Sequence, residues 1–285
     1  MSLSAAARQS LKMAQRHYEN FPVASRLLPR ALRLPVAAIY AFARSADDIA
    51  DEGGLSAAER LAALDAYRDQ LDRLARGETV DRPVFTALAE AVAAHRLPLA
   101  PFYDLLSAFR QDVVKTRYAD FAELADYCSR SANPIGRLLL HLYGVDGEAP
   151  RAGSDAICTG LQLVNFLQDL RGDYARGRVY LPQDALARAG IDPRTLAGSR
   201  ADGALRAVLR AEAARARGLL RSGRPLIGAL PGRAAWELRF TLAGGLRVLE
   251  KFDAGLERGR LTPARLRPWD WVILSARVLR PGGLP

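Results

Sequence analysis

The chain has 285 residues, of which 49% are hydrophobic, and a net charge of +10. This apolar content can form a substantial core and argues against general disorder. Almost all of the positive charge is arginine, spread evenly along the chain, with lysine only at Lys12, Lys115 and Lys251. Because the chain has no basic run or known nucleic-acid motif, we expect no nucleic-acid partner.

Cysteine use and the N-terminal residues indicate the compartment. Cys128 and Cys158 lack the CxxC spacing of zinc and redox sites, so we interpret both as buried small apolar residues in a reducing environment. The first 20 residues are too polar for a signal peptide, and the apolar run Val36–Ala43 is too short to span a bilayer. We therefore expect a cytoplasmic protein that at most lies on the inner face of the membrane.

The elements expected along the chain are helices. Apolar residues recur mostly at helical spacing, and β-branched residues rarely cluster. Proline and glycine divide these segments at short intervals, without a repeat of fixed period or a long linker. The pattern predicts an all-α fold and a single domain over residues 1–285.

The first helix of chemical interest is predicted over Tyr40–Glu52. Asp47 and Asp51 are four residues apart, and Asp48 and Asp51 are three apart, so the three carboxylates share one side of the helix. Taken alone, this cluster is better explained as a solvated acidic face.

A second helix is predicted over Gly160–Asp173. Asn165, Asp169 and Asp173 follow one another at intervals of four, and Gln162 stands three residues before Asn165. The intervening positions are mostly apolar, which leaves little of the helix to face water. This polar stripe has no obvious surface role, which favours a functional interpretation of both clusters.

The two clusters predict a magnesium-bound diphosphate. Carboxylates about 6 Å apart repel by roughly 3 kcal/mol at an effective dielectric constant near 20. A divalent cation would remove this repulsion, and all-oxygen ligands suit Mg²⁺, which commonly bridges carboxylates to phosphates. Nearby arginines could donate to phosphate oxygens, with Arg44 and Arg178 favoured over Arg171 and Arg176.

The C-terminal part is less informative. Gly177–Asp202 is the least helical stretch, and it could close over a site or be an ordinary surface loop. The last hundred residues receive no site, and Trp236, Trp269 and Trp271 are interpreted as packing or surface anchors.

Other chemistries lose support. The chain has no phosphate-binding glycine loop, no zinc-type histidine spacing and no GxSxG nucleophile motif. His95 and His141 are therefore interpreted as structural residues.

The paired motifs, Asp47-Asp48-x-x-Asp51 and Asn165-x-x-x-Asp169-x-x-x-Asp173, resemble the squalene and phytoene synthase superfamily. The resemblance extends from His17 to Pro182 and includes the segments Tyr127–Gly136 and Gly177–Pro182. It implies an isoprenoid synthase-type helical bundle with a central active-site cavity. It also implies a Mg²⁺-dependent enzyme acting on a prenyl diphosphate.

Within the superfamily, His17–Ser25 and Ser131–Gly136 look most like the hydroxysqualene synthases of hopanoid biosynthesis. Such an enzyme takes presqualene diphosphate, releases diphosphate and captures water. Squalene and phytoene-type condensing members commonly carry arginine where this chain has Gln168, a departure that favours the specialised reaction.

The resemblance also implies roles for individual residues. The expected catalytic residues, which hold magnesium, are Asp47, Asp51, Asn165, Asp169 and Asp173, with Asp48 as a supporting metal ligand. The expected substrate-binding residues are Arg44, Asp48, Tyr127, Asn133, Gly136, Gln162, Gln168 and Arg178. Tyr127, Asn133 and Gly136 are expected along the cavity between the acidic helices. Candidates for orienting water are His17, Tyr18, Asn133 and Gln168.

Several alternatives remain open. A condensing synthase of the same superfamily would join two farnesyl diphosphates, and an inactive relative would serve as a helical scaffold or assembly factor. The apolar product and the basic sequence together suggest peripheral contact with an anionic membrane.

Overall fold

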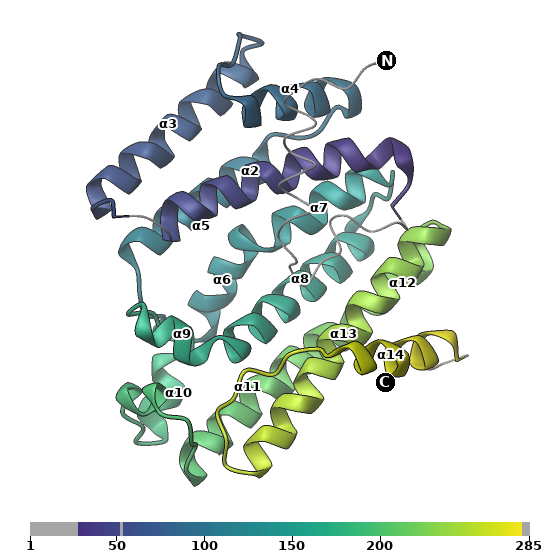
Figure 1. Ribbon diagram of the computed structural model, residues 1–285. Helices are drawn as coiled ribbons and strands as arrows, with labels where there is room; N and C mark the ends of the chain where they lie inside the picture. Colours follow the sequence, from purple (N-terminus) through teal and green to yellow (C-terminus); the bar gives the residue numbers. More distant parts are fainter. Residues whose placement is uncertain (1–27, 52–53, 281–285) are drawn as a thin grey trace. The chain divides into compact units, whose positions relative to one another are not determined.

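The computed structural model describes residues 28–51 and 54–280. Within these ranges the chain is built of helices, with isolated bridges at Arg117–Val179 and Arg200–Arg260 and no strand, so the predicted all-α fold is confirmed (Figure 1). Within the same ranges, no helix has the length and apolarity that a membrane crossing needs. The residues divide into two compact units, and the single domain over residues 1–285 stays a prediction.

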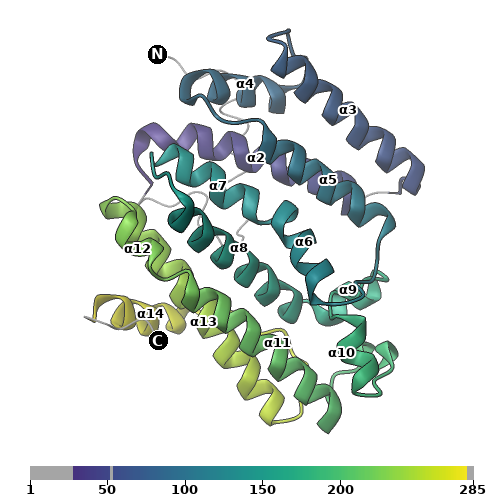
Figure 2. The same cartoon turned by 180° about the vertical axis from the view of Figure 1, so that it is seen from behind.

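Of the described residues, the first unit comprises 28–51, 54–115, 130–147 and 231–234. Its described elements are η1 (Arg30–Leu32), α2 (Arg33–Asp51), α3 (Ala57–Ala75), α4 (Pro83–His95), α5 (Ala100–Val114) and α7 (Asn133–Leu142). Helix α2 contacts α3, α4 and α5, and α5 also packs against α7 (Figure 2).

Aromatic side chains hold α2 in the core of the first unit. Phe42 is fully buried, and its ring meets Phe102 and Phe85 edge to face at centroid distances of 5.2 and 5.6 Å. Tyr67 of α3 lies 6.1 Å from the same ring. Edge-to-face pairs add specific geometry to apolar burial. The core therefore fixes the helix that carries the first acidic motif.

Local sequence signals set the helix boundaries in this unit. Ser56 caps α3 in a capping box with Glu59, in which each side chain bonds the backbone N–H of the other residue. Pro83 begins α4, where its missing N–H costs no helical hydrogen bond. His141 contacts the carbonyl oxygen of His95 through Nε2 at 3.0 Å, in agreement with its structural interpretation.

The second unit comprises the described residues 116–129, 148–230 and 235–280. Its elements are α6 (Phe121–Ser131), α8 (Glu148–Gln168), α9 (Leu170–Ala175), α10 (Gln183–Arg188), η2 (Pro193–Ala197), α11 (Gly203–Ser222), α12 (Leu226–Ala229), α13 (Gly232–Glu257) and α14 (Pro268–Leu279). The stretch Gly177–Asp202, predicted to be least helical, contains only the short elements α10 and η2.

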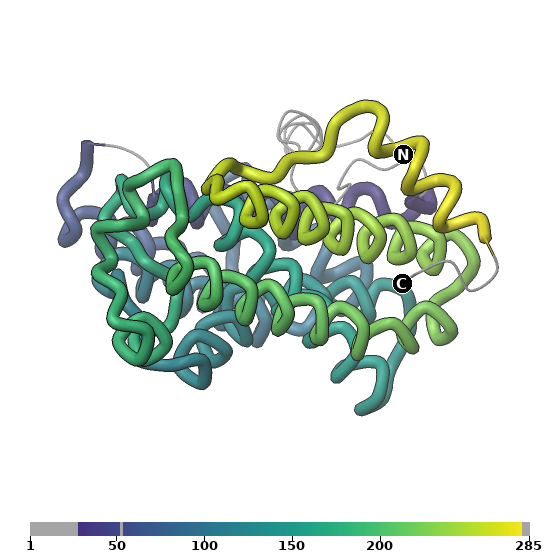
Figure 3. The backbone as a smooth tube through the Cα atoms, turned by 90° about the horizontal axis from the view of Figure 1, so that it is seen from below, coloured from purple at the N-terminus to yellow at the C-terminus, as the bar shows by residue number. Residues whose placement is uncertain are grey.

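Glycines allow α8 to approach α11 and α13 closely. A Cβ on Gly160 would lie 3.1 Å from Leu220 of α11, and a Cβ on Gly245 of α13 would lie 3.0 Å from Leu161 of α8. Figure 3 shows α11 and α13 running side by side along this part of the unit. Cys128 and Cys158 are both buried, as predicted. The packing of α8 against α11 and α13 positions Asn165, the residue of the second motif that α8 carries.

Candidate functional site

The first motif lies near the C-terminal end of α2. Arg44 Nη2 lies 2.7 Å from Asp48 Oδ1, and Arg44 Nη1 lies 3.6 Å from Asp47 Oδ2. The Asp48 oxygen is buried and has no well-aligned hydrogen bond. Asp51, one turn further on, is the last described residue of the helix. The structure therefore brings Arg44, Asp47 and Asp48 together on one helical surface.

The electrostatics of this helix end are unfavourable without a cation. The C-terminus of a helix carries a partial negative charge, and acidic side chains there are destabilising. Three carboxylates gather in the final described turns of α2, and Arg44 pairs with Asp48 and Asp47. The donors are all hard oxygen atoms, which is the ligand chemistry of Mg²⁺. The donor chemistry of these residues fits a magnesium ion.

The second motif departs from the predicted geometry at a single residue. Helix α8 ends at Gln168, Asp169 has φ −104° and ψ 13°, and α9 begins at Leu170. The uninterrupted helix predicted over Gly160–Asp173 is therefore wrong at Asp169. The backbone bonds from Asp169 N to Asn165 O (3.0 Å) and from Asp173 N to Asp169 O (2.8 Å) preserve the four-residue register. The three motif residues thus keep helical spacing through the break.

Asp173 is the most perturbed carboxylate of the motif. Its side chain is buried, and this burial raises its pKa to about 6, although an ion pair with Arg176 at 2.6 Å and the nearby Arg178 oppose the shift. The neighbouring charge of Asp169 raises the pKa further. A bound divalent cation would stabilise the ionised form. Asp173 is therefore the described residue whose environment fits a metal most directly.

Arg178 lies beside Asp173. Its side chain is buried, and its backbone N–H donates to Asp173 O at 2.8 Å. Of the arginines that follow the motif, Arg178 and Arg176 are thus the two that the structure brings to Asp173. Buried arginine is uncommon in proteins and suits charge-assisted binding of an oxyanion.

The predicted polar residues of α8 differ in their surroundings. Asp169 is exposed, whereas Gln162, Asn165 and Gln168 are half-buried. Gln168 Nε2 donates to the carbonyl oxygen of Ala264 at 2.5 Å. The amide of Gln168 therefore ties the end of α8 to the segment that leads into α14.

A cluster of aromatic rings adjoins the second motif. Phe166 stacks on Tyr180 with a centroid distance of 3.9 Å and an interplanar angle of 7°. Tyr127 and Tyr118 lie 6.0 and 5.8 Å from the Tyr180 ring. Sequence reasoning identified Tyr127 but missed Phe166 and Tyr180. The signal available was the position of Tyr180 in the Gly177–Pro182 segment and of Phe166 directly after Asn165.

The other predicted site residues lie on α7. Asn133 is its first residue and Gly136 lies one turn later, and both are buried in the first unit. Tyr127 lies on α6, where it joins the aromatic cluster of the second unit. His17 and Tyr18 lie outside the described residues.

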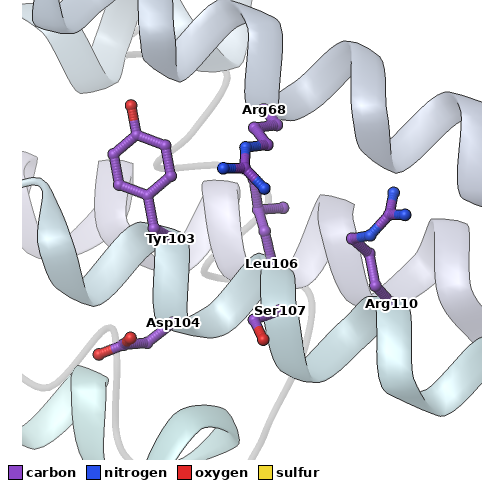
Figure 4. A pocket seen from close by; sticks show the side chains of 6 residues that line it. All are labelled: Arg68, Tyr103, Asp104, Leu106, Ser107 and Arg110. Atoms are coloured by element: carbon purple, nitrogen blue, oxygen red, sulfur yellow. The ribbon is translucent and has the colours of Figure 1, made fainter.

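A pocket in the first unit contains none of the predicted site residues. Figure 4 shows its lining by Arg68, Tyr103, Asp104, Leu106, Ser107 and Arg110, from α3 and α5. Arg110 pairs with Asp65, and Tyr103 donates to Asp72 at 2.6 Å. Burial, together with this hydrogen bond, raises the pKa of Tyr103 to about 12. Much of the polar lining of the pocket is thus already ion-paired or hydrogen-bonded within the protein.

The predicted metal ligands do not form a complete group in the described residues. Across residues 28–51 and 54–280, no three histidine, cysteine, aspartate or glutamate side chains are grouped so that they could hold a metal ion together.

Comparisons with known proteins agree with these features. The profile described as "Squalene/phytoene synthase" matches residues 14–270. A hydroxysqualene synthase of Rhodopseudomonas palustris is 38% identical over 267 residues, covering 92% of this chain and 90% of the relative. A phytoene synthase of Mycobacterium tuberculosis is also 38% identical, over 219 residues, covering 76% and 71%.

A solved structure supports the same relationship. The crystal structure of squalene synthase HpnC from Alicyclobacillus acidocaldarius superposes with a TM-score of 0.79 at 37% identity, covering 92% of this chain and 98% of that one. The profile match and the near full-length relatives lead to one assignment. The chain belongs to the squalene/phytoene synthase family.

Proposed function

We propose that this protein is a hydroxysqualene synthase that converts presqualene diphosphate and water to hydroxysqualene and diphosphate. The observation that carries the proposal is the near full-length similarity to relatives of that name, at 38% and 36% identity, in a chain that keeps both carboxylate motifs. Gln168, where condensing members commonly have arginine, supports the same choice. The family as a whole acts on prenyl diphosphates.

The proposed reaction begins with the loss of diphosphate. The C–O bond to diphosphate breaks, and the diphosphate leaves with the electron pair. The resulting cyclopropylcarbinyl cation rearranges, a water oxygen forms the new C–O bond, and the water loses a proton. Bound magnesium would neutralise the charge that develops on the diphosphate.

The chain supplies oxygen donors and cationic donors for this step. Asp47 and Asp51 on α2, and Asn165, Asp169 and Asp173 on α8 and α9, would be the magnesium ligands, with Asp48 in support. Arg44 and Arg178 would donate charge-assisted hydrogen bonds to the diphosphate oxygens. Gln162 is assigned to substrate binding, and Asn133 and Gln168 are candidates for orienting water.

The aromatic rings next to the motif have a separate role. The faces of Tyr127, Phe166 and Tyr180 are buried together, and such faces attract a cation while excluding water. Tyr127 and Gly136 would contact the hydrocarbon chain. The C30 product is apolar, so we also propose that the protein works in the cytoplasm in peripheral contact with an anionic membrane.

Product analysis tests the proposal. Purified protein with Mg²⁺ is given presqualene diphosphate or farnesyl diphosphate, and the extracts are identified by mass. We expect a C30 alcohol from presqualene diphosphate alone, and none from Asp169→Ala. The matched control is Asp184→Ala, which removes an exposed carboxylate paired with Arg188 in the same unit and should retain activity.

The second candidate function is head-to-head condensation of two prenyl diphosphates. It is favoured by the phytoene synthase relatives and by the squalene synthase structure described above. Turnover of farnesyl diphosphate without turnover of presqualene diphosphate would establish it in place of the first proposal. An absence of diphosphate release from both substrates would favour the scaffold role instead.

A further inference from the structure

Helix α14 exposes a face made of large apolar side chains. The exposed residues are Trp269, Trp271, Val272, Ile273 and Leu279. The exposed fractions of Trp269, Val272 and Leu279 are 65%, 72% and 68%. Trp269, Val272, Ile273 and Leu279, together with the small exposed Ala276, follow successive turns of one side of the helix, and Trp271 lies outside this side. Single exposed apolar residues are ordinary, but a continuous face of this kind marks an interaction surface.

The opposite face of α14 is firmly attached to α13. Asp270 is fully buried and accepts hydrogen bonds from Arg247 Nε at 2.8 Å and Lys251 Nζ at 2.5 Å. Arg277 binds Glu250 through both terminal nitrogens, at 2.6 and 3.1 Å. Leu274 and Val278 are buried on the same side. The exposed face is therefore presented by an anchored helix.

The charged residues on and beside α14 indicate what kind of partner binds this face. The only acidic residue of α14 is Asp270, which is buried, so no carboxylate of the helix is exposed. The exposed Arg267 and Arg280 stand immediately before and after it. Tryptophan and aliphatic side chains bounded by arginine are the features of helices that lie in the interface of an anionic bilayer.

A second copy of the chain fits this face less well. A two-fold symmetric contact would pair the face with itself and bring arginines of the two copies close together. An anionic lipid surface instead offers phosphates to the arginines and acyl chains to the apolar residues.

We propose that the exposed face of α14 docks the protein on anionic lipid bilayers. Trp269, Val272 and Leu279 enter the boundary between headgroups and acyl chains, and Arg267 and Arg280 bind lipid phosphates. This surface deepens the membrane contact proposed above. Its role in exchanging an apolar product rests on the proposed function, whereas docking itself does not depend on which prenyl diphosphate is the substrate.

Vesicle sedimentation without substrate tests the docking. The native protein should pellet with vesicles that contain phosphatidylglycerol, less so at high salt, and weakly with pure phosphatidylcholine. Trp269→Ser and Leu279→Ser should each lower partitioning roughly tenfold. Val114→Ser is the matched control, because Val114 is 66% exposed on α5 of the other unit and should leave partitioning unchanged.

A charge variant and a fluorescence measurement test the two parts of the face separately. Arg280→Gln should weaken binding to anionic vesicles roughly fivefold, equivalent to about 1 kcal/mol, and leave binding to neutral vesicles unchanged. In a chain carrying Trp236→Phe and Trp271→Phe, brominated lipids should quench Trp269. Circular dichroism checks that each variant is folded.

The same experiments define the contrary results. Equal pelleting of native protein and folded Trp269→Ser would overturn the proposal. So would a native dimer that Leu279→Ser dissociates without vesicle binding, because the face would then bind a second copy. If the protein binds vesicles but releases no diphosphate, the docking surface stands and the proposed function is rejected. If it releases diphosphate but does not bind vesicles, the proposed function stands and the docking surface is rejected.

Discussion

At the scale of single residues, Asp270 combines complete burial with charge. Burial alone would raise its pKa, but hydrogen bonds from Lys251, the Arg267 backbone N–H and Arg247 hold the pKa well below its ordinary value. We expect Asp270→Asn to lower the free energy of unfolding by about 2 kcal/mol at pH 7. The partners are partly exposed and can regain water, which keeps the loss below that of a fully buried pair. Urea denaturation measures it.

The pH dependence of this loss has a defined sign. Because the folded-state pKa is depressed, the stabilisation is complete above the unfolded-state pKa of about 3.9 and falls as the pH decreases below it. The difference between native protein and Asp270→Asn should therefore narrow below about pH 4. Asp184→Asn, at an exposed ion pair, should change stability by less than about 1 kcal/mol. A difference of constant size down to pH 3 would contradict the assignment.

The ring of Tyr180 gives a second prediction at this scale. The ring stacks on Phe166, which directly follows Asn165 of the second motif. If the Tyr180 ring stabilises the carbocation of the proposed reaction, Tyr180→Leu should lower kcat for presqualene diphosphate roughly tenfold. Tyr180→Phe should keep most of kcat, because it retains the aromatic ring. Thermal melts of both variants separate this effect from loss of folding. Equal kcat for the two variants would assign Tyr180 a packing role only.

At the scale of elements, packing of α11 on α8 depends on close approach at Gly223. A Cβ there would lie 2.3 Å from Ile157 Cγ1 and 2.6 Å from the Gly153 carbonyl oxygen. Gly223→Ala should cost about 1–3 kcal/mol, since backbone atoms cannot move aside cheaply. Gly218→Ala on the same helix meets no atom within 4 Å and should gain roughly 0.5–1 kcal/mol from helix propensity. Chemical denaturation measures the free energy of unfolding of both variants. Changes of the same sign in Gly223→Ala and Gly218→Ala would contradict this packing.

Periodicity predicted the elements but not their interruptions. The pattern of Asn165, Asp169 and Asp173 is the same for a continuous helix and for one that breaks at Asp169, because the four-residue backbone bonds persist through the break. Helix η2 depends on a local cap, in which the Asp192 side chain accepts from Arg194 N. Such bonds leave no periodic signal.

The two faces of α14 illustrate a second limit. Apolar residues occur all round this helix, so its sequence does not say which side is buried. The side is fixed by Asp270, whose partners Arg247 and Lys251 come from another helix. The sequence left Trp269 and Trp271 as either packing residues or surface anchors. Both are exposed in the structure, which supports the surface interpretation. Long-range ion pairs of this kind are visible only in the folded chain.

At the scale of the whole molecule, ligand binding should be linked to stability. The proposed function assigns magnesium ligands to both motifs, and all of them are oxygen atoms with negative or partial negative charge. Arg44 and Arg176 offset part of the repulsion among these carboxylates in the free protein, and a bound cation would offset more. A ligand that binds only the folded chain adds about 2.7 kcal/mol at a concentration of 100 times its Kd.

Thermal melting with inorganic diphosphate tests this linkage. Mg²⁺ and diphosphate together should raise Tm by roughly 5–10 °C, whereas diphosphate with EDTA should raise it little, since the carboxylates repel a free anion. Asp47→Asn and Asp169→Asn should each reduce the shift strongly, because either motif alone supplies only part of the ligand set. Asp81→Asn changes an exposed carboxylate paired with Arg73 and should leave the shift intact. A full shift in Asp47→Asn would mean that the first motif holds no magnesium, and the carboxylates near the end of α2 would then need another explanation.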